Sequence, residues 1–131
     1  MPRRIVIKRA GSPSVLDMQD MEMPTPNDGE VCIEVHFAGI NFADTLMRLG
    51  LYQPRPDYPF TPGYELSGVV HTVGANVLDL EVGQRVVAAV PSGAQSSHVC
   101  VQESRVIPIP DKMGLDAAAA MPVTYLTAHH M

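Results

Sequence analysis

The chain has 131 residues, with 14 acidic and 9 basic side chains and a formal net charge of -5. A chain of this length can bury one hydrophobic core without disulfides or metals. The acidic balance and the absence of a Lys/Arg run exclude nucleic acid and anionic membrane surfaces as expected partners. Residues 5–7 (IVI), between the basic side chains of the N-terminus, are too short for a signal peptide or an integral membrane segment.

Strand patterns dominate the chain. Residues 30–37 alternate between apolar and mostly polar side chains, which predicts a half-buried strand. Further β-branched runs at 66–73, 85–90 and 98–101 are separated by turns rich in Gly, Pro and Asn. A mainly β domain of short strands is therefore expected. In the first strand, one face is predicted to carry Val31, Ile33, Val35 and Phe37, and the other Glu30, Cys32, Glu34 and His36.

Two short helices interrupt this pattern. Asn41 is a good N-cap residue, apolar side chains recur at helical spacing after it, and Gly50 stands where a helix would end. A second helix is predicted at the alanine run 117–120, with Asp116 as its cap.

Cysteine and histidine spacing predicts no metal site. Cys32 and Cys100 lie on apolar strands without C-x-x-C spacing, so we expect buried, reduced thiols, in keeping with a cytoplasmic protein. His129 and His130 are adjacent rather than one helical turn apart. The remaining histidines occur singly on strand patterns, where surface or hydrogen-bonded residues are more common than ligands; they are His36, His71 and His98.

Three segments together resemble a known family: 39–44 (GINFAD), 50–52 (GLY) and 62–68 (PGYELSG). They are similar to the active-site half of the medium-chain dehydrogenase/reductase family, in its zinc-free quinone reductase branch and its vesicle amine transport protein-like subgroup. The zinc enzymes of that family have Cys in place of Asn41 and His in place of Tyr64. Because an amide and a phenol are poor zinc ligands, the resemblance implies no zinc. The four-cysteine lobe of the zinc enzymes is also missing, since residues 89–98 hold no Cys.

The resemblance implies a GroES-like, partly open barrel, mainly β with short helices, over residues 1–121. Residues 122–131 would then begin the hinge helix into a dinucleotide-binding domain. Members of the family are more than twice as long, and no G-x-G-x-x-G for a pyrophosphate occurs here. The expectation is therefore a fragment truncated before the Rossmann domain, inactive by itself.

Asn41 and Tyr52 are the candidate catalytic residues. Spacing alone makes Asn41 a helix cap, whereas the resemblance places it beside the nicotinamide and the substrate, and the two roles are compatible. Tyr52 matches a tyrosine that donates a proton in related enoyl-thioester reductases. A phenol with a pKa of about 10 can stabilise and then protonate an oxyanion, although an ordinary half-buried aromatic is an equal reading.

Tyr64 and Thr127 are candidate binding residues, for the substrate and the cofactor respectively. Tyr64 is expected to line the substrate cleft, and Glu65 beside it to be a local hydrogen-bond acceptor. The resemblance brings Thr127 to the nicotinamide, the alternative being a mid-helix Thr bonded to its own helix.

The expected function is that of the substrate-side domain of an NADPH-dependent, zinc-independent quinone or enone oxidoreductase. The choice of NADPH over NADH rests on the family resemblance alone. The resemblance implies a small-molecule quinone or enone as substrate, a cytoplasmic location and a homodimer for the full-length protein. Two alternatives stay open: a non-enzymatic lipid or vesicle interaction protein of the same branch, and an enoyl-thioester reductase.

Overall fold

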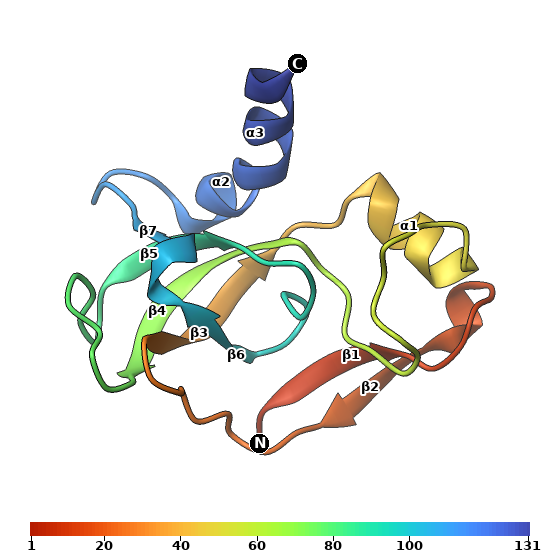
Figure 1. Ribbon diagram of the computed structural model, residues 1–131, viewed down its shortest axis with the longest axis horizontal. Coiled ribbons are helices and arrows are strands. Elements are labelled where there is room, and N and C mark those ends of the chain that lie inside the picture. Colours follow the sequence, from red (N-terminus) through yellow and green to blue (C-terminus); the bar gives the residue numbers. More distant parts are fainter.

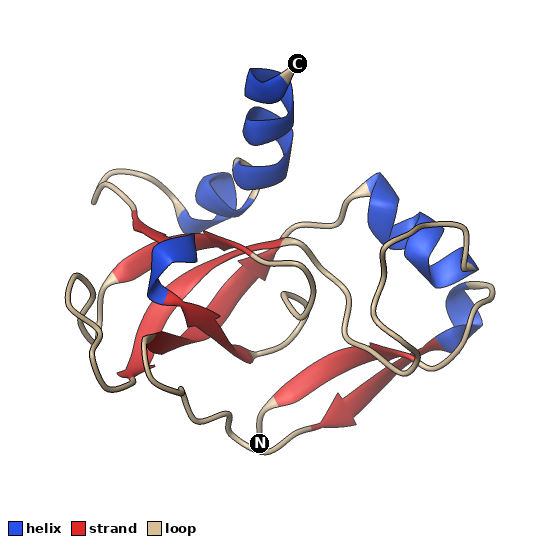
Figure 2. Cartoon of the chain, in the orientation of Figure 1, coloured by secondary structure: helices blue, strands red, loops and turns tan.

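A five-stranded antiparallel sheet forms the centre of the molecule. The computed structural model describes all of residues 1–131, and its main sheet has the strand order β6-β3-β4-β5-β7 (Figure 1). The sheet is open and does not close into a barrel (Figure 2). Its strands are β3 (Glu30–Ala38), β4 (Glu65–Val73), β5 (Arg85–Ala89), β6 (His98–Gln102) and β7 (Val106–Pro108). The predicted mainly β class is confirmed.

The hydrophobic core lies against one face of this sheet. Val31, Ile33 and Leu66 have no exposed surface, because inward-facing positions of β3 and β4 pack against those of β5 and β6. The four strands predicted from sequence all exist, with ends that differ by one residue. The core members are Val31, Ile33, Leu66, Val70, Leu80, Val86, Ala88, Val90, Ala94, Val101 and Val106.

Phe37 corrects the predicted alternation of β3. Its side chain is 48% exposed, although the pattern assigns it to the core face with Val31 and Ile33. The register against β4 shifts between Val35 and Phe37, so His36 is an extra residue in a β-bulge. Since a bulge adds one residue to one strand, it interrupts the strict alternation of faces beyond it.

The two cysteines are free and face one another. Cys32 on β3 is paired in register with Cys100 on β6. Cys32 is fully buried, and burial raises its pKa. Burial, together with the Cys32 thiol, raises the pKa of Cys100 to about 12. Both side chains are therefore protonated, poorly reactive thiols at neutral pH. The expected burial is confirmed for Cys32, whereas Cys100 is half-buried.

A second, smaller core joins an N-terminal hairpin to a helix. The hairpin consists of β1 (Arg3–Ile7) and β2 (Leu16–Asp20), linked by the 3₁₀ turn η1 (Pro13–Val15). Its Ile7 and Val15 pack with Met47 of α1 (Phe42–Leu49) and with Phe60. This hairpin was not predicted. The helix α1 was predicted. Its N-cap Asn41 is confirmed, and so is its end at Gly50, which lies in the left-handed region (φ 76°).

The C-terminal helices sit over one end of the sheet. A 3₁₀ turn, η2 (Glu103–Arg105), separates β6 from β7. The next helix, α2 (Leu115–Ala119), is capped by Gly114, and the predicted cap Asp116 lies in its first turn instead. The last helix, α3 (Pro122–His130), projects away from the sheet and contains no buried residue (Figure 1). None of the helices has both the length and the apolarity needed to cross a bilayer.

Met47 should stabilise α1 against the hairpin. It is 1% exposed, and replacing a buried Met by Ala costs about 2–5 kcal/mol through lost burial and a residual cavity. We expect Met47→Ala to lower the free energy of unfolding by that amount in urea denaturation. Leu49→Ala is the matched control on the same helix, because Leu49 is 41% exposed. An equal loss in both variants would show that the cluster does not hold α1.

Candidate active site

The site begins at the first turn of α1. The Asp44 N–H donates to the Asn41 carbonyl at 3.0 Å, and the Asn41 N–H donates to Asp44 Oδ2 at 2.8 Å. The other oxygen, Oδ1, accepts from the Gly63 N–H at 3.1 Å. Burial raises the pKa of Asp44, the N–H groups of Asn41 and Gly63 oppose this rise, and the Glu65 charge adds to it. One buried carboxyl thus fixes the helix start to the loop before β4.

Glu65 connects two elements that are far apart in sequence. Its side chain is 3% exposed. Oε1 accepts from Asn41 Nδ2 at 3.0 Å, and Oε2 accepts from the Val123 N–H at 2.8 Å. Val123 is the second residue of α3, where backbone N–H groups have no partner within the helix. A carboxylate there also interacts favourably with the helix dipole. Glu65 is a hydrogen-bond acceptor as expected, but its partners are distant.

Gly39 makes room for this carboxylate. A Cβ placed on Gly39 would overlap the carboxylate oxygen Oε1 and the side-chain carbons of Glu65. The absence of a side chain at residue 39 is therefore a packing requirement rather than a requirement of backbone conformation.

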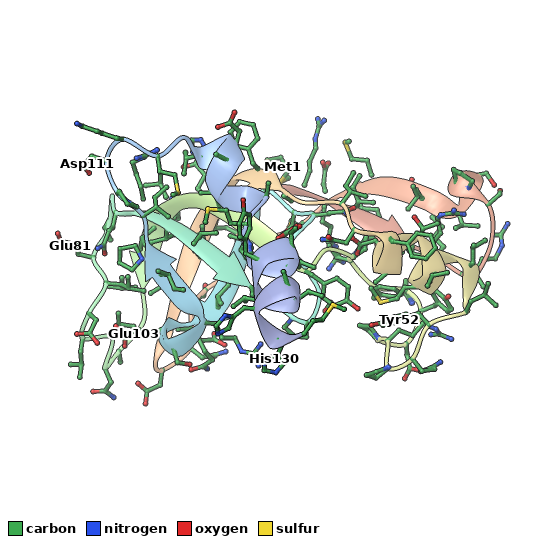
Figure 3. All side chains as sticks on the ribbon, turned by 90° about the horizontal axis from the view of Figure 1, so that it is seen from above. Met1, Tyr52, Glu81, Glu103, Asp111 and His130 are labelled. Atoms are coloured by element: carbon green, nitrogen blue, oxygen red, sulfur yellow. The ribbon has the colours of Figure 1, made fainter.

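A pocket of about 480 Å³ opens beside these groups. The four candidate residues Asn41, Tyr52, Tyr64 and Thr127 all line it. They come from the start of α1, the loop after it, the approach to β4 and the middle of α3. In Figure 3, α3 with His130 at its end lies between the main sheet and the segment that carries Tyr52. The rest of the wall is mostly apolar: Phe42, Ala43, Ala89, Val90, Pro122, Val123 and Leu126.

Two other hollows have similar volumes, about 530 Å³ and 490 Å³. The first lies between the hairpin and the β3–β6 side of the sheet, and the second beside β7 and α3. Neither contains a candidate catalytic side chain. The pocket beside α1 is the candidate site because it gathers polar groups from several elements within apolar walls, as ligand sites do.

The two tyrosines of the pocket differ in their environment. The Tyr64 hydroxyl donates to Met47 Sδ at 3.6 Å and is thereby directed toward the second core. Burial raises the pKa of Tyr64, and the neighbouring Tyr52 hydroxyl and the Asp44 carboxylate raise it further. Tyr64 is therefore a neutral wall residue at physiological pH. Tyr52 is half-buried and packs at the edge of the same core.

The groups at residues 41 and 64 do not match zinc coordination. Zinc takes thiolate, imidazole or carboxylate ligands in a tetrahedron. Here the Asn41 amide nitrogen donates to Glu65, both Glu65 oxygens accept hydrogen bonds, and the Tyr64 phenol faces a thioether. Neither Asn41 nor Tyr64 offers an anionic ligand atom.

Sequence reasoning missed the two buried carboxylates as organising groups. Asp44 had a signal, because an acidic residue three positions after an N-cap is the spacing of a capping box. Glu65 had none, since its contacts span 24 and 58 residues. The Thr127 carbonyl accepts from Met131 N–H within its helix, while the Thr127 side chain lines the pocket.

Comparisons with known proteins agree with this fold. Residues 27–111 match the alcohol dehydrogenase GroES-like domain. The synaptic vesicle membrane protein VAT-1 homolog-like of Mus musculus is 38% identical over 129 residues, which is 98% of this chain and 31% of that protein. The crystal structure of its human counterpart superposes with a TM-score of 0.95 at 38% identity, over 98% of this chain and 42% of that one.

A solved enzyme is also similar. The quinone oxidoreductase of Thermus thermophilus, determined alone and with NADPH, gives a TM-score of 0.83 at 39% identity, over 98% of this chain and 39% of that one. The fold and the matched domain thus define a GroES-like domain protein. The chain belongs to the medium-chain dehydrogenase/reductase family. It spans about a third of the length of the curated relatives it matches.

Glu65 should couple α1 to α3. In Glu65→Gln an NH₂ group, which is a donor, replaces one of the two accepting oxygens. The remaining oxygen cannot serve both Asn41 Nδ2 and the Val123 N–H, so one of these donors loses its partner. Losing one hydrogen bond to a buried charge should lower the free energy of unfolding by about 1–3 kcal/mol. The NMR signals of the Asn41 side-chain amide and the Val123 N–H should both shift.

Glu103→Gln provides the comparison. Glu103 also accepts from two backbone N–H groups, those of Leu78 and Asp79, but at an exposed place outside the pocket. Its loss should leave the Asn41 and Val123 signals unchanged. If Glu65→Gln moves neither signal, the carboxylate does not connect the two helices in solution.

Proposed function

We propose that this chain is the substrate-side domain of an NADPH-dependent, zinc-independent quinone or enone oxidoreductase. Residues 1–121 form that domain, and 122–131 begin the hinge to a dinucleotide-binding domain. One observation carries the proposal: Asn41, Tyr52, Tyr64 and Thr127, from four separate segments, line a single apolar pocket. The similarity to quinone oxidoreductases supports it.

Tyr52 is the proposed proton donor. Addition of hydride to an enone or a quinone moves an electron pair onto the carbonyl oxygen, which must be stabilised and then protonated. A neutral phenol can donate a hydrogen bond to that oxygen and then protonate it. One well-placed donor to a developing oxyanion contributes roughly 3 kcal/mol. Tyr64, held against Met47, shapes the substrate side of the pocket.

Asn41 and Thr127 are the proposed contacts to the cofactor. NADPH supplies the hydride when bound, and a relative has been solved as its NADPH complex. The Glu65 bridge fixes the Asn41 amide, and the same bridge fixes the start of the helix that carries Thr127. The two side chains would therefore be the parts of this chain that contact the nicotinamide end of the cofactor. The remainder of the cofactor would bind to the other domain, so the isolated chain should not turn over quinones. The full-length protein would be cytoplasmic and homodimeric.

Zinc independence can be checked by elemental analysis. The cleft lacks ionised thiolate or imidazole donors at residues 41 and 64. We expect no stoichiometric zinc in the protein after gel filtration in metal-free buffer, because Asn41 and Tyr64 supply none of the usual ligands of a tetrahedral zinc site. One zinc per chain that survives this treatment, and that is retained when the exposed His71 and Glu34 are replaced by Ala and Gln, would contradict the proposal.

Tyr52→Phe in a full-length protein carrying this chain tests the mechanism. The substitution removes one hydroxyl and keeps the ring, so packing and cofactor affinity should change little. We expect kcat for an enone to fall by roughly one to three powers of ten. Quinones should lose less, because their reduced products are weak bases. Steady-state kinetics with both substrate types measure the difference.

Tyr58→Phe is the matched control. The Tyr58 hydroxyl donates to the Met47 carbonyl at 2.7 Å and lies outside the pocket lining. Its loss should lower the melting temperature, and any fall in kcat should be the same for enones and quinones. An unchanged kcat in Tyr52→Phe with an enone would reduce Tyr52 to a packing residue.

A second candidate function is lipid or vesicle interaction without catalysis. The similarity to proteins named for the synaptic vesicle membrane favours it. Binding of the full-length protein to lipid vesicles, measured by flotation with and without NADPH, separates the two. Vesicle binding without any NADPH oxidation across quinones and enones would favour this alternative.

A further inference from the structure

We propose that the outer face of β4, β3 and β6 carries a binding site for a divalent transition-metal ion, formed by Glu34, His71 and His98. One ligand atom from each of the three residues lies within 4.8 Å of those of the other two. The site is separate from the pocket beside α1 and shares no residue with its lining. Sequence spacing gave no indication of it, because each residue occurs on a different strand.

The register of the sheet brings Glu34 and His98 together. They are directly opposite each other in the antiparallel pair of β3 and β6. Side chains of such a pair lie on the same face, with Cβ atoms about 4.5–5.5 Å apart. Ile33, the neighbour of Glu34 on β3, belongs to the core. Glu34 and His98 therefore lie on the opposite, solvent-facing side of the sheet.

A β-bulge brings in His71 from the other side of β3. Cys32 pairs with Thr72 of β4, but the next pair is Ile33 with Val70, so His71 is an extra residue without a partner. Bulges re-aim single side chains and are common next to functional sites. The bulge leaves Val70 in the core and presents His71 on the face that carries Glu34. The His71 and His98 rings are 5.1 Å apart between centroids and inclined at 75°.

The separations suit a metal ion. Zinc–ligand bonds of about 2.0–2.2 Å in a tetrahedron place the ligand atoms roughly 3.3 Å apart. Glu34 and His71 are exposed and His98 is half-buried, so small side-chain rotations can close the remaining gap. Three protein ligands leave a fourth position for water or an exogenous ligand, which predicts an exchangeable ion.

The chemistry of the three groups selects the class of ion. Imidazole nitrogens favour Zn²⁺, Cu²⁺ and Ni²⁺, whereas Mg²⁺ and Ca²⁺ take oxygen ligands. His98 Nδ1 contacts Ser97 Oγ at 3.2 Å. In the Nδ1–H tautomer, this contact orients the ring and leaves the Nε2 lone pair free for an ion, the usual arrangement around a metal-bound histidine.

Titration of the chain with Zn²⁺ alone tests the proposal. The chain is first freed of metal, in a His129→Ala/His130→Ala background that removes the exposed pair at the end of α3. Calorimetry should show saturable binding of one Zn²⁺ per chain, and excess Mg²⁺ should not compete. Co²⁺ in its place should give the visible absorption of a low-symmetry site.

His71→Ala and Glu34→Gln should each weaken Zn²⁺ binding by roughly tenfold or more, because even the loss of an outer-shell partner costs 10–100-fold. Both side chains are exposed, so the variants should fold, which their circular dichroism spectra check. His36→Ala is the matched control, an exposed β3 histidine outside the cluster, and should bind Zn²⁺ as before.

Three results would overturn the proposal: no saturable Zn²⁺ binding, unchanged affinity in both ligand variants, or an equal loss in His36→Ala. These outcomes do not depend on oxidoreductase activity. The metal site can therefore fail while the proposed function stands, and the reverse also holds.

Discussion

The Glu65 carboxylate is the contact on which the geometry of the candidate site depends. It is buried at the start of β4, and each oxygen accepts a hydrogen bond from a different helix start. A buried charge without partners would be strongly destabilising, so the carboxylate requires both Asn41 and Val123 to be in place. The central sheet thereby sets the position of α1 and α3, and with them the two ends of the pocket. Gly39 has no side chain because this carboxylate occupies the space.

The second core, formed by Ile7, Val15, Met47 and Phe60, supports the same site by packing against α1. Met47 on α1 packs with the hairpin residues Ile7 and Val15, and its sulfur and carbonyl accept hydrogen bonds from Tyr64 and Tyr58. The N-terminal hairpin contributes no residue to the pocket. It nevertheless determines where α1 lies, because it packs against Met47. Disturbing it should affect the site through α1, whereas disturbing the main core should affect the site through β4.

Local features were predictable from the sequence and long-range ones were not. Asn41 as a cap and Gly50 as a stop were correct because helix ends are encoded within a few residues. Asp116 was wrong because Gly114, two residues earlier, already begins the helix. Phe37 was assigned to the wrong face because a bulge interrupts the alternation, and no local pattern indicates a bulge. The gathering of Asn41, Tyr52, Tyr64 and Thr127 followed from family resemblance, not from their spacing.

The contact between α3 and the Glu65 carboxylate has a consequence for the shape of the pocket. The helix holds no buried residue, and its side of the Glu65 bridge is a single N–H in the first turn. Its nine residues extend roughly 13 Å, so a tilt of about 10° around that N-terminal attachment would displace the far end by about 2 Å. Thr127 lies part of the way along this arm. A change in the angle of α3 would therefore change the width of the pocket, while the Asn41 wall would stay fixed to the sheet.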